Sequence, residues 1–170
     1  MASFGAIKSR DKEILLKKTI STEKAIMEPA IEQAEFKAFL SQWNDNEQQI
    51  KKVFLHLKDH LARKPDSIFE VVSRPGVSYS LRTRHQHQKQ RPLFAMIDII
   101  DDDPSHRWLS VCFFGAMISD PDGIGDFVPE GLLGEDAHCF DIEAWDDALV
   151  AYVIARLDEA YDKAASEPAA

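Results

Sequence analysis

Two apolar runs near the middle of the chain, separated by an acidic break, predict the core of the fold. The first run, Leu93–Ile100, stops at Asp101-Asp102-Asp103-Pro104, and the second, Trp108–Ile118, is nearly all apolar. Each run is too short to cross a membrane as a helix and too apolar to be a strand with one face in water. We therefore predict two neighbouring buried strands joined by a turn.

Three other stretches carry apolar residues at helical spacing. The clearest helix runs from Glu47 to Leu61, behind a capping-box pattern that begins at Asp45. A second helix is predicted from Pro29 to Trp43, because proline is well tolerated in the first helical turn. A third, from Glu143 to Ala165, has an apolar stripe that can cover one face of a sheet.

Alternating apolar and polar residues predict a hairpin before the core strands. Its strands, Ser67–Ser73 and Val77–Arg82, are joined by the turn Arg74-Pro75-Gly76. Thr83–Gln90 has no apolar residue to pack, so we expect a loop there. After the core strands, Asp120–Asp136 holds four of the seven glycines and two prolines, which predicts a long irregular segment before a short strand at 138–142.

This order of elements predicts an α+β fold. We expect a mainly antiparallel sheet of about five strands packed against N-terminal helices and a C-terminal helix, because short connections join only antiparallel neighbours. A chain of 170 residues is long enough for one sizeable core. The predicted organisation is a helical extension over residues 1–28, a single domain over 29–165 and a frayed tail over 166–170.

The net charge of −9 hides an uneven distribution along the chain. Residues 1–91 hold 17 Lys and Arg against 11 Asp and Glu, whereas residues 92–170 hold 3 against 18. The two halves either neutralise each other across the fold or, if they separate in space, make the molecule electrically two-sided.

The cysteines and the N-terminal residues bear on location and assembly. Cys112 and Cys139 both lie in apolar runs, so we expect small buried side chains in a reducing compartment. Without the apolar stretch of a secretion signal or membrane anchor, the N-terminus favours a cytoplasmic protein. Residues 1–28 combine apolar side chains with basic charge, so we expect them to pack on the acidic half of the same molecule or of a second copy in a homodimer.

Four features resemble the small bacterial YdhG-like and YjbR-like domains. They are the helix Glu47–Leu61, the strand Val77–Leu81 after a proline turn, the run Pro92–Ala95, and the closing strand and helix from Phe140 to Tyr161. The resemblance implies a frataxin-like α+β sandwich. Because some members of that group are described as iron chaperones and others as DNA-binding proteins, it favours a binding protein over an enzyme, and it assigns no site residue.

A basic segment between the predicted hairpin and the core strands is a candidate anion site. It contains no acid, and its cations are Arg74, Arg82, Arg84, Lys89 and Arg91. Such a segment can neutralise phosphates or weakly bind nucleic acid. The alternative is a solvated loop that pairs with the acidic half, since the overall pI of about 5.1 repels a polyanion.

Two groups of residues are candidate metal ligands. His56 and His60 are four residues apart on the clearest helix, a spacing that can place both imidazoles on one ion. Asp101, Asp102 and Asp103 offer oxygen ligands to a hard cation. The alternatives are ordinary packing for the histidines and turn formation for the aspartates, so no cofactor is expected unless a divalent metal such as iron binds there.

Asp98 is the candidate for enzymatic chemistry, because it interrupts an apolar strand. A carboxylate there should be paired, protonated or at a sheet edge, and acid–base chemistry would need a second group such as His138 nearby. No motif in the chain specifies a reaction. We therefore expect a non-catalytic binding or adaptor domain for a protein or small molecule; the alternatives are a metal-binding protein, a weak nucleic-acid or phosphate binder, and an enzyme using Asp98.

Overall fold

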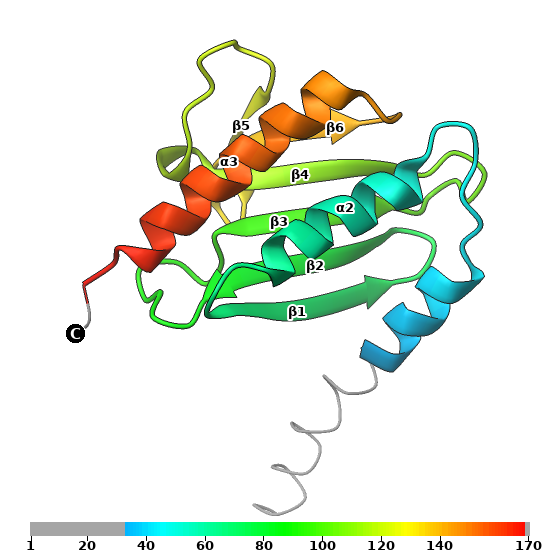
Figure 1. The fold of residues 1–170 in the computed structure, drawn as a ribbon, viewed down its shortest axis with the longest axis horizontal. Helices are drawn as coiled ribbons and strands as arrows, with labels where there is room; N and C mark the ends of the chain where they lie inside the picture. The colour runs from blue at the N-terminus through cyan, green and yellow to red at the C-terminus, as the bar shows by residue number, and fades with distance from the viewer. Residues whose placement is uncertain (1–32, 169–170) are drawn as a thin grey trace, which may run out of the picture.

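A computed structural model describes residues 33–168 of the chain (Figure 1). Residues 33–42 are helical, and the elements that follow are α2 (Ile50–Ala62), β1 (Ser67–Arg74), β2 (Ser78–His85), β3 (Ala95–Ile100), β4 (Trp108–Phe114), the 3₁₀ turn η1 (Gly115–Met117), β5 (Asp126–Leu132), β6 (Glu135–Ile142) and α3 (Asp147–Ala165). The extension predicted over residues 1–28 lies outside the described residues.

All six strands form one antiparallel sheet in the order β1-β2-β3-β4-β6-β5. The predicted α+β class is therefore confirmed, with six strands where about five were expected. The additional strand is β5, which lies inside the segment 120–136 predicted to be irregular. Its residues do not alternate, because six of the seven are exposed and only Leu132 is buried. Sequence periodicity could not reveal a strand of this kind.

β2 extends further than predicted, into the polar segment that was expected to be a loop. Thr83 and His85 are buried in the strand, and Gln88 just beyond it is buried as well. The Gln88 side chain holds the segment by accepting from the His85 N–H at 3.2 Å and donating to the Leu93 carbonyl at 2.8 Å. Buried polar side chains that are satisfied locally explain why the absence of apolar residues was misleading.

The helices α2 and α3 lie on the same face of the sheet (Figure 1). α2 buries the apolar stripe that the sequence indicated, Ile50, Val53, Phe54, Leu57 and Leu61. Asp45 does cap this helix, although not as a capping box. Its two carboxylate oxygens accept from the N–H groups of Lys51 and Lys52 in the first turn, both at 3.1 Å.

On the opposite face of the sheet, a row of polar side chains crosses four strands. Ser80, Asp98, Ser110 and Asp141 stand opposite one another in successive pairs of β2, β3, β4 and β6. Neither helix α2 nor α3 covers this face, and antiparallel sheets commonly leave one face solvated. The row shows that Asp98 lies outside the core between the sheet and the helices.

A second row on this face carries the two cysteines. Cys112 of β4 and Cys139 of β6 are direct cross-strand partners with Cα atoms 4.2 Å apart, and a disulfide joins them. The prediction of separate buried cysteines is therefore wrong, because the pairing of β4 with β6 is not visible in the sequence. The expectation of a reducing compartment loses its premise, since disulfides persist mainly in oxidising surroundings.

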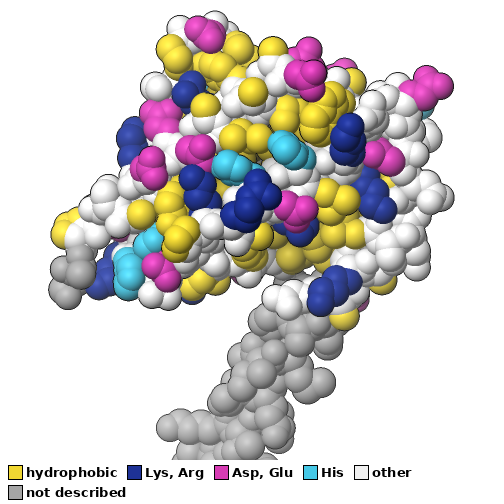
Figure 2. All heavy atoms as spheres, in the orientation of Figure 1, with side chains coloured by type: hydrophobic (Ala, Val, Ile, Leu, Met, Phe, Trp, Pro, Cys, Tyr) yellow, Lys and Arg dark blue, Asp and Glu magenta, His cyan; other side chains and the backbone are white. Residues whose placement is uncertain are grey.

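The described surface mixes charges of both signs. Figure 2 shows Lys and Arg side chains interspersed with Asp and Glu over the helix-bearing face. Pairs join the basic and acidic halves of the chain, such as Arg91 with Glu135 at 3.0 Å and Lys64 with Asp158 at 2.5 Å. Within residues 33–168, no helix is both long and apolar enough to span a membrane.

Candidate functional site

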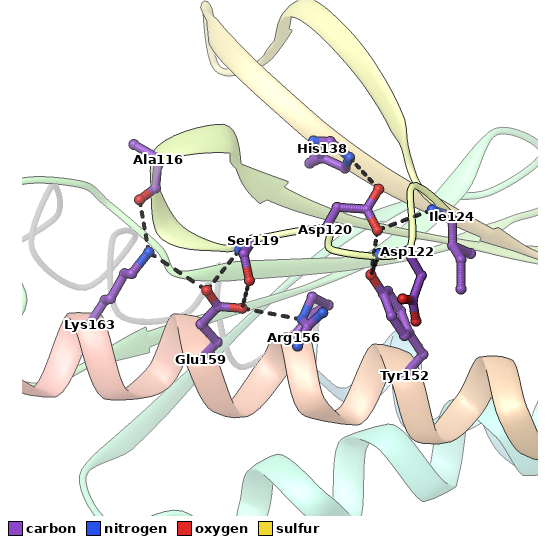
Figure 3. A network of polar contacts seen from close by, with 10 residues as sticks. All are labelled: Ala116, Ser119, Asp120, Asp122, Ile124, His138, Tyr152, Arg156, Glu159 and Lys163. Carbon is purple, nitrogen blue, oxygen red and sulfur yellow. Dashed lines mark hydrogen bonds and ion pairs between the residues drawn. The ribbon is translucent and has the colours of Figure 1, made fainter.

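A buried carboxylate, Asp120, ties together the segment that follows η1, strand β6 and helix α3 (Figure 3). Its side chain is 7% exposed. Oδ2 accepts from His138 Nε2 at 2.9 Å and from the Gly125 N–H at 2.9 Å. Oδ1 accepts from the Tyr152 hydroxyl at 2.5 Å and from the Ile124 N–H at 3.1 Å.

These four donors keep Asp120 ionised. Burial by itself would raise the pKa of Asp120, but the hydrogen bonds from Tyr152, the two backbone N–H groups and His138 outweigh burial and hold the pKa at about 2. An ionised carboxylate only accepts, so Nε2 of His138 carries the proton that it donates. In the neutral imidazole, Nδ1 of His138 is then the acceptor.

The local sequence permits this close approach. A Cβ atom at Gly125 would lie 2.7 Å from His138 Cδ2 and 2.8 Å from the Phe140 ring, so glycine lets the loop lie directly against β6. On the α3 side, the hydroxyl of Tyr152 also accepts from the Asp122 N–H at 3.3 Å. The loop that the Asp-Pro-Asp-Gly string predicts as a turn is thus anchored at several points.

A second carboxylate, Glu159, anchors the start of the same segment (Figure 3). It accepts from the Ser119 N–H at 2.7 Å and from the Ser119 hydroxyl at 3.2 Å. It also forms ion pairs with Arg156 at 3.2 Å and with Lys163 at 3.8 Å on α3. Together, Asp120 and Glu159 fix the residues that lead into the β5–β6 hairpin.

Two open cavities flank the Asp120 network. The first, of about 580 Å³, is lined by His138, Phe127 and Arg91 together with acidic residues of the hairpin. The second, of about 550 Å³, is lined by Tyr152 and Ile124 together with acidic residues at the start of α3. The residues that hold Asp120 thus also form walls of the cavities on either side of the hairpin.

The hairpin carries most of the exposed large apolar side chains of the described chain. Six such side chains occur within residues 33–168, and four of them are Ile124, Phe127, Val128 and Leu133, exposed by 48%, 59%, 37% and 55%. We call these four residues the hairpin surface. They lie on and beside β5, which is an edge strand with one unpaired side.

The basic candidates are distributed over separate places rather than gathered in one site. Arg74 at the end of β1 donates to the Ser78 hydroxyl at 2.8 Å, and Arg82 and Arg84 lie on β2. The backbone N–H of Lys89 donates to Glu167 at 2.6 Å. Arg91 pairs with Glu135 in the first cavity and stacks on Phe114, 5.2 Å from the ring centre.

The metal-ligand candidates are likewise not brought together. His60 contacts Asp158 at 2.7 Å, whereas His56 lies against the Trp145 ring. Asp101 is buried and pairs with Arg107 at 2.6 Å, while Asp102 and Asp103 stand exposed in the turn. Among residues 33–168, no group of three or more His, Cys, Asp or Glu is arranged to hold a metal ion.

Asp98 stands in the polar row of the uncovered face without a histidine partner. Its cross-strand neighbour is Ser80, and Oδ1 of Asp98 and Oγ of Ser80 are both buried without a hydrogen bond. Burial raises the pKa of Asp98, and the Ser80 hydroxyl and the charges of Arg74 and Arg82 offset only part of that effect.

Sequence reasoning missed the Asp120 network, since only His138 had been named as a possible partner in acid–base chemistry. Asp120 was read as a turn former and Tyr152 was not singled out. The two residues are 32 positions apart and meet only because α3 packs beside the loop. One signal was present, namely the glycines around Asp120, which indicated a segment that must approach other elements closely.

Comparisons with protein-family models, curated proteins and solved structures give no match for this chain. The resemblance to the YdhG-like and YjbR-like domains therefore stays a prediction from the sequence.

Proposed function

We propose that the chain is a binding or adaptor domain that holds an extended, basic and apolar segment of a partner protein along β5. The observation that supports this function is the hairpin surface, which places four exposed apolar side chains on and beside an edge strand. Edge strands with exposed apolar residues are natural sites for strand addition by another chain.

The geometry of β5 supports an extended ligand. Phe127 and Val128 are consecutive strand residues and point to opposite faces, so a partner that follows the edge contacts both. The two cavities lie on either side and can receive alternate side chains of the partner. Pro129 lacks an N–H group, which confines regular pairing to the first part of the strand.

The charge around the hairpin supports a basic partner. Residues 92–170 carry 18 acidic against 3 basic side chains, and acids of the hairpin line the first cavity: Glu130, Glu135 and Asp136. Complementary charge of this kind raises the association rate and selects among partners.

Selection from a library of ten-residue peptides tests the function, with Lys or Arg alternating with aliphatic residues and a matched library carrying Glu in place of the bases. We expect enrichment only from the basic library, and at least tenfold weaker binding after Phe127→Ser combined with Leu133→Ser. Val77→Ser is the matched control, because Val77 is 55% exposed, like Leu133, but lies at the β1–β2 turn. Equal enrichment from both libraries, or an equal loss in the control, would contradict the proposal.

A further inference from the structure

An apolar groove of about 270 Å³ lies at the other end of the sheet, beside edge strand β1. Helix 33–42 contributes Phe36 and Leu40 to its lining, and the sheet contributes Phe69, Val71 and Leu81. Both charged residues of the lining are positive, Lys37 and Lys58. The groove is separate from the hairpin surface, so an occupant here is independent of the proposed function.

The chain itself begins at this groove. Gln33, the first described residue, is part of the groove lining. Glu28 precedes it by five residues, a span of at most about 17 Å when fully extended. A segment tethered this closely has an effective concentration in the millimolar range, so modest apolar contact is enough to keep it bound.

The sequence of residues 21–32 fits the chemistry of the groove. It offers Ile26, Met27 and Ile31 as apolar side chains, and it holds three Glu against one Lys. Residues 1–20, by contrast, hold five Lys and Arg against two acids, which Lys37 and Lys58 would repel. Only the part of the N-terminal segment that adjoins the groove is complementary to it in charge.

We propose that residues 21–32 of the same chain occupy this groove, with Ile26 and Met27 on the apolar lining and Glu23 or Glu28 beside Lys58. Burial of two such side chains is favourable by the ordinary hydrophobic effect. The contact closes the β1 side of the molecule, where the described residues provide no further strand.

Zero-length carbodiimide cross-linking of the full chain, read by mass spectrometry, tests the proposal. The reagent joins a carboxylate to an amine only when the two are in contact, so we expect an amide between Lys58 and Glu23 or Glu28. Lys58 is the diagnostic amine, since it lies on α2 and is distant in sequence. Ile26→Asp combined with Met27→Asp should reduce this product at least tenfold without touching the folded domain.

Ile14→Asp combined with Leu15→Asp is the matched control and should leave the Lys58 product unchanged. Mixing ¹⁵N-labelled with unlabelled protein distinguishes the two possible sources of the segment. The proposal is overturned by the absence of a Lys58 product in the wild type, by a product that survives the Ile26 and Met27 changes, or by a product that joins labelled to unlabelled chains.

Discussion

A single carboxylate, Asp120, accepts four hydrogen bonds from three parts of the chain. Hydrogen bonds to a charged acceptor contribute more than neutral ones, and an acceptor lost from a buried position leaves its donors unsatisfied. The position of the hairpin entry therefore depends on the charge state of one residue.

Asp120→Asn should lower the free energy of unfolding by about 2 kcal/mol, because the amide group turns a donor toward the hydroxyl and N–H donors that Asp120 accepts from. Denaturant titration measures the change. Asp122→Asn is the control on the same loop, where the side chain is exposed, and it should have almost no effect. Equal stability of the Asp120 variant and the wild type would show that the network contributes nothing.

The same residue predicts how stability depends on pH. The pKa of Asp120 is about 2 in the folded protein, below the unfolded value of about 3.9. The stabilisation is therefore complete above about pH 4 and is lost as the pH falls toward 2, an effect on the order of 2 kcal/mol. Unfolding titrations between pH 5 and pH 2 should show a steeper loss for the wild type than for Asp120→Asn.

Asp98 is expected to behave in the opposite way. Burial raises its pKa, so its charged form destabilises the folded protein near neutral pH. Asp98→Asn should raise the free energy of unfolding at pH 7, by on the order of 1 kcal/mol, with the gain shrinking as the pH falls and Asp98 protonates. Thermal melts at pH 7 and pH 4 measure this. Asp126→Asn, an exposed strand position, is the control, and a variant less stable than wild type at pH 7 would contradict the account.

At the scale of elements, the Cys112–Cys139 disulfide closes the part of the chain that contains η1, the Asp120 loop and β5. The bond joins residues 27 positions apart. Cross-linking a loop of that length restricts the unfolded chain and stabilises by about 3.5 kcal/mol in the chain-entropy account.

Replacing both cysteines by serine should therefore lower the free energy of unfolding by about that amount. Denaturant titration of the double variant measures it. Dithiothreitol should reproduce the loss in the wild type and leave the double variant unchanged. A wild type that is equally stable with and without the reductant would show that the bond does not stabilise the fold.

The elements that the sequence predicted well are those with a regular pattern of their own. Helix α2 has its whole apolar stripe buried, and the hairpin of β1 and β2 follows from alternation and a proline turn. β5 was missed because its stabilisation comes from pairing with β6, while its side chains face solvent. Asp120 was missed for a related reason, since its partners are set by tertiary packing.

At the scale of the molecule, the uneven charge of the two halves is partly neutralised within the fold. Arg91 meets Glu135, and the N–H groups of Lys89 and Gln90 meet Glu167 near the C-terminus. Such contacts explain why the basic segment does not stand free as a flexible anion-binding loop. The acids around the hairpin surface have few basic neighbours in sequence, which leaves that end of the molecule suited to a basic partner.

The strand order has a consequence for how the chain folds. β1 to β4 follow one another in the sheet, so they can form early through short loop closures, whereas β6 reaches β4 only across the intervening η1, loop and β5. The β5–β6 hairpin forms from neighbouring residues and then docks as a unit. Until it docks, β4 presents a free edge with Val111 and Phe113 uncovered, and chains caught at this stage will associate through it. Rapid docking of the hairpin is therefore what keeps newly made chains from aggregating.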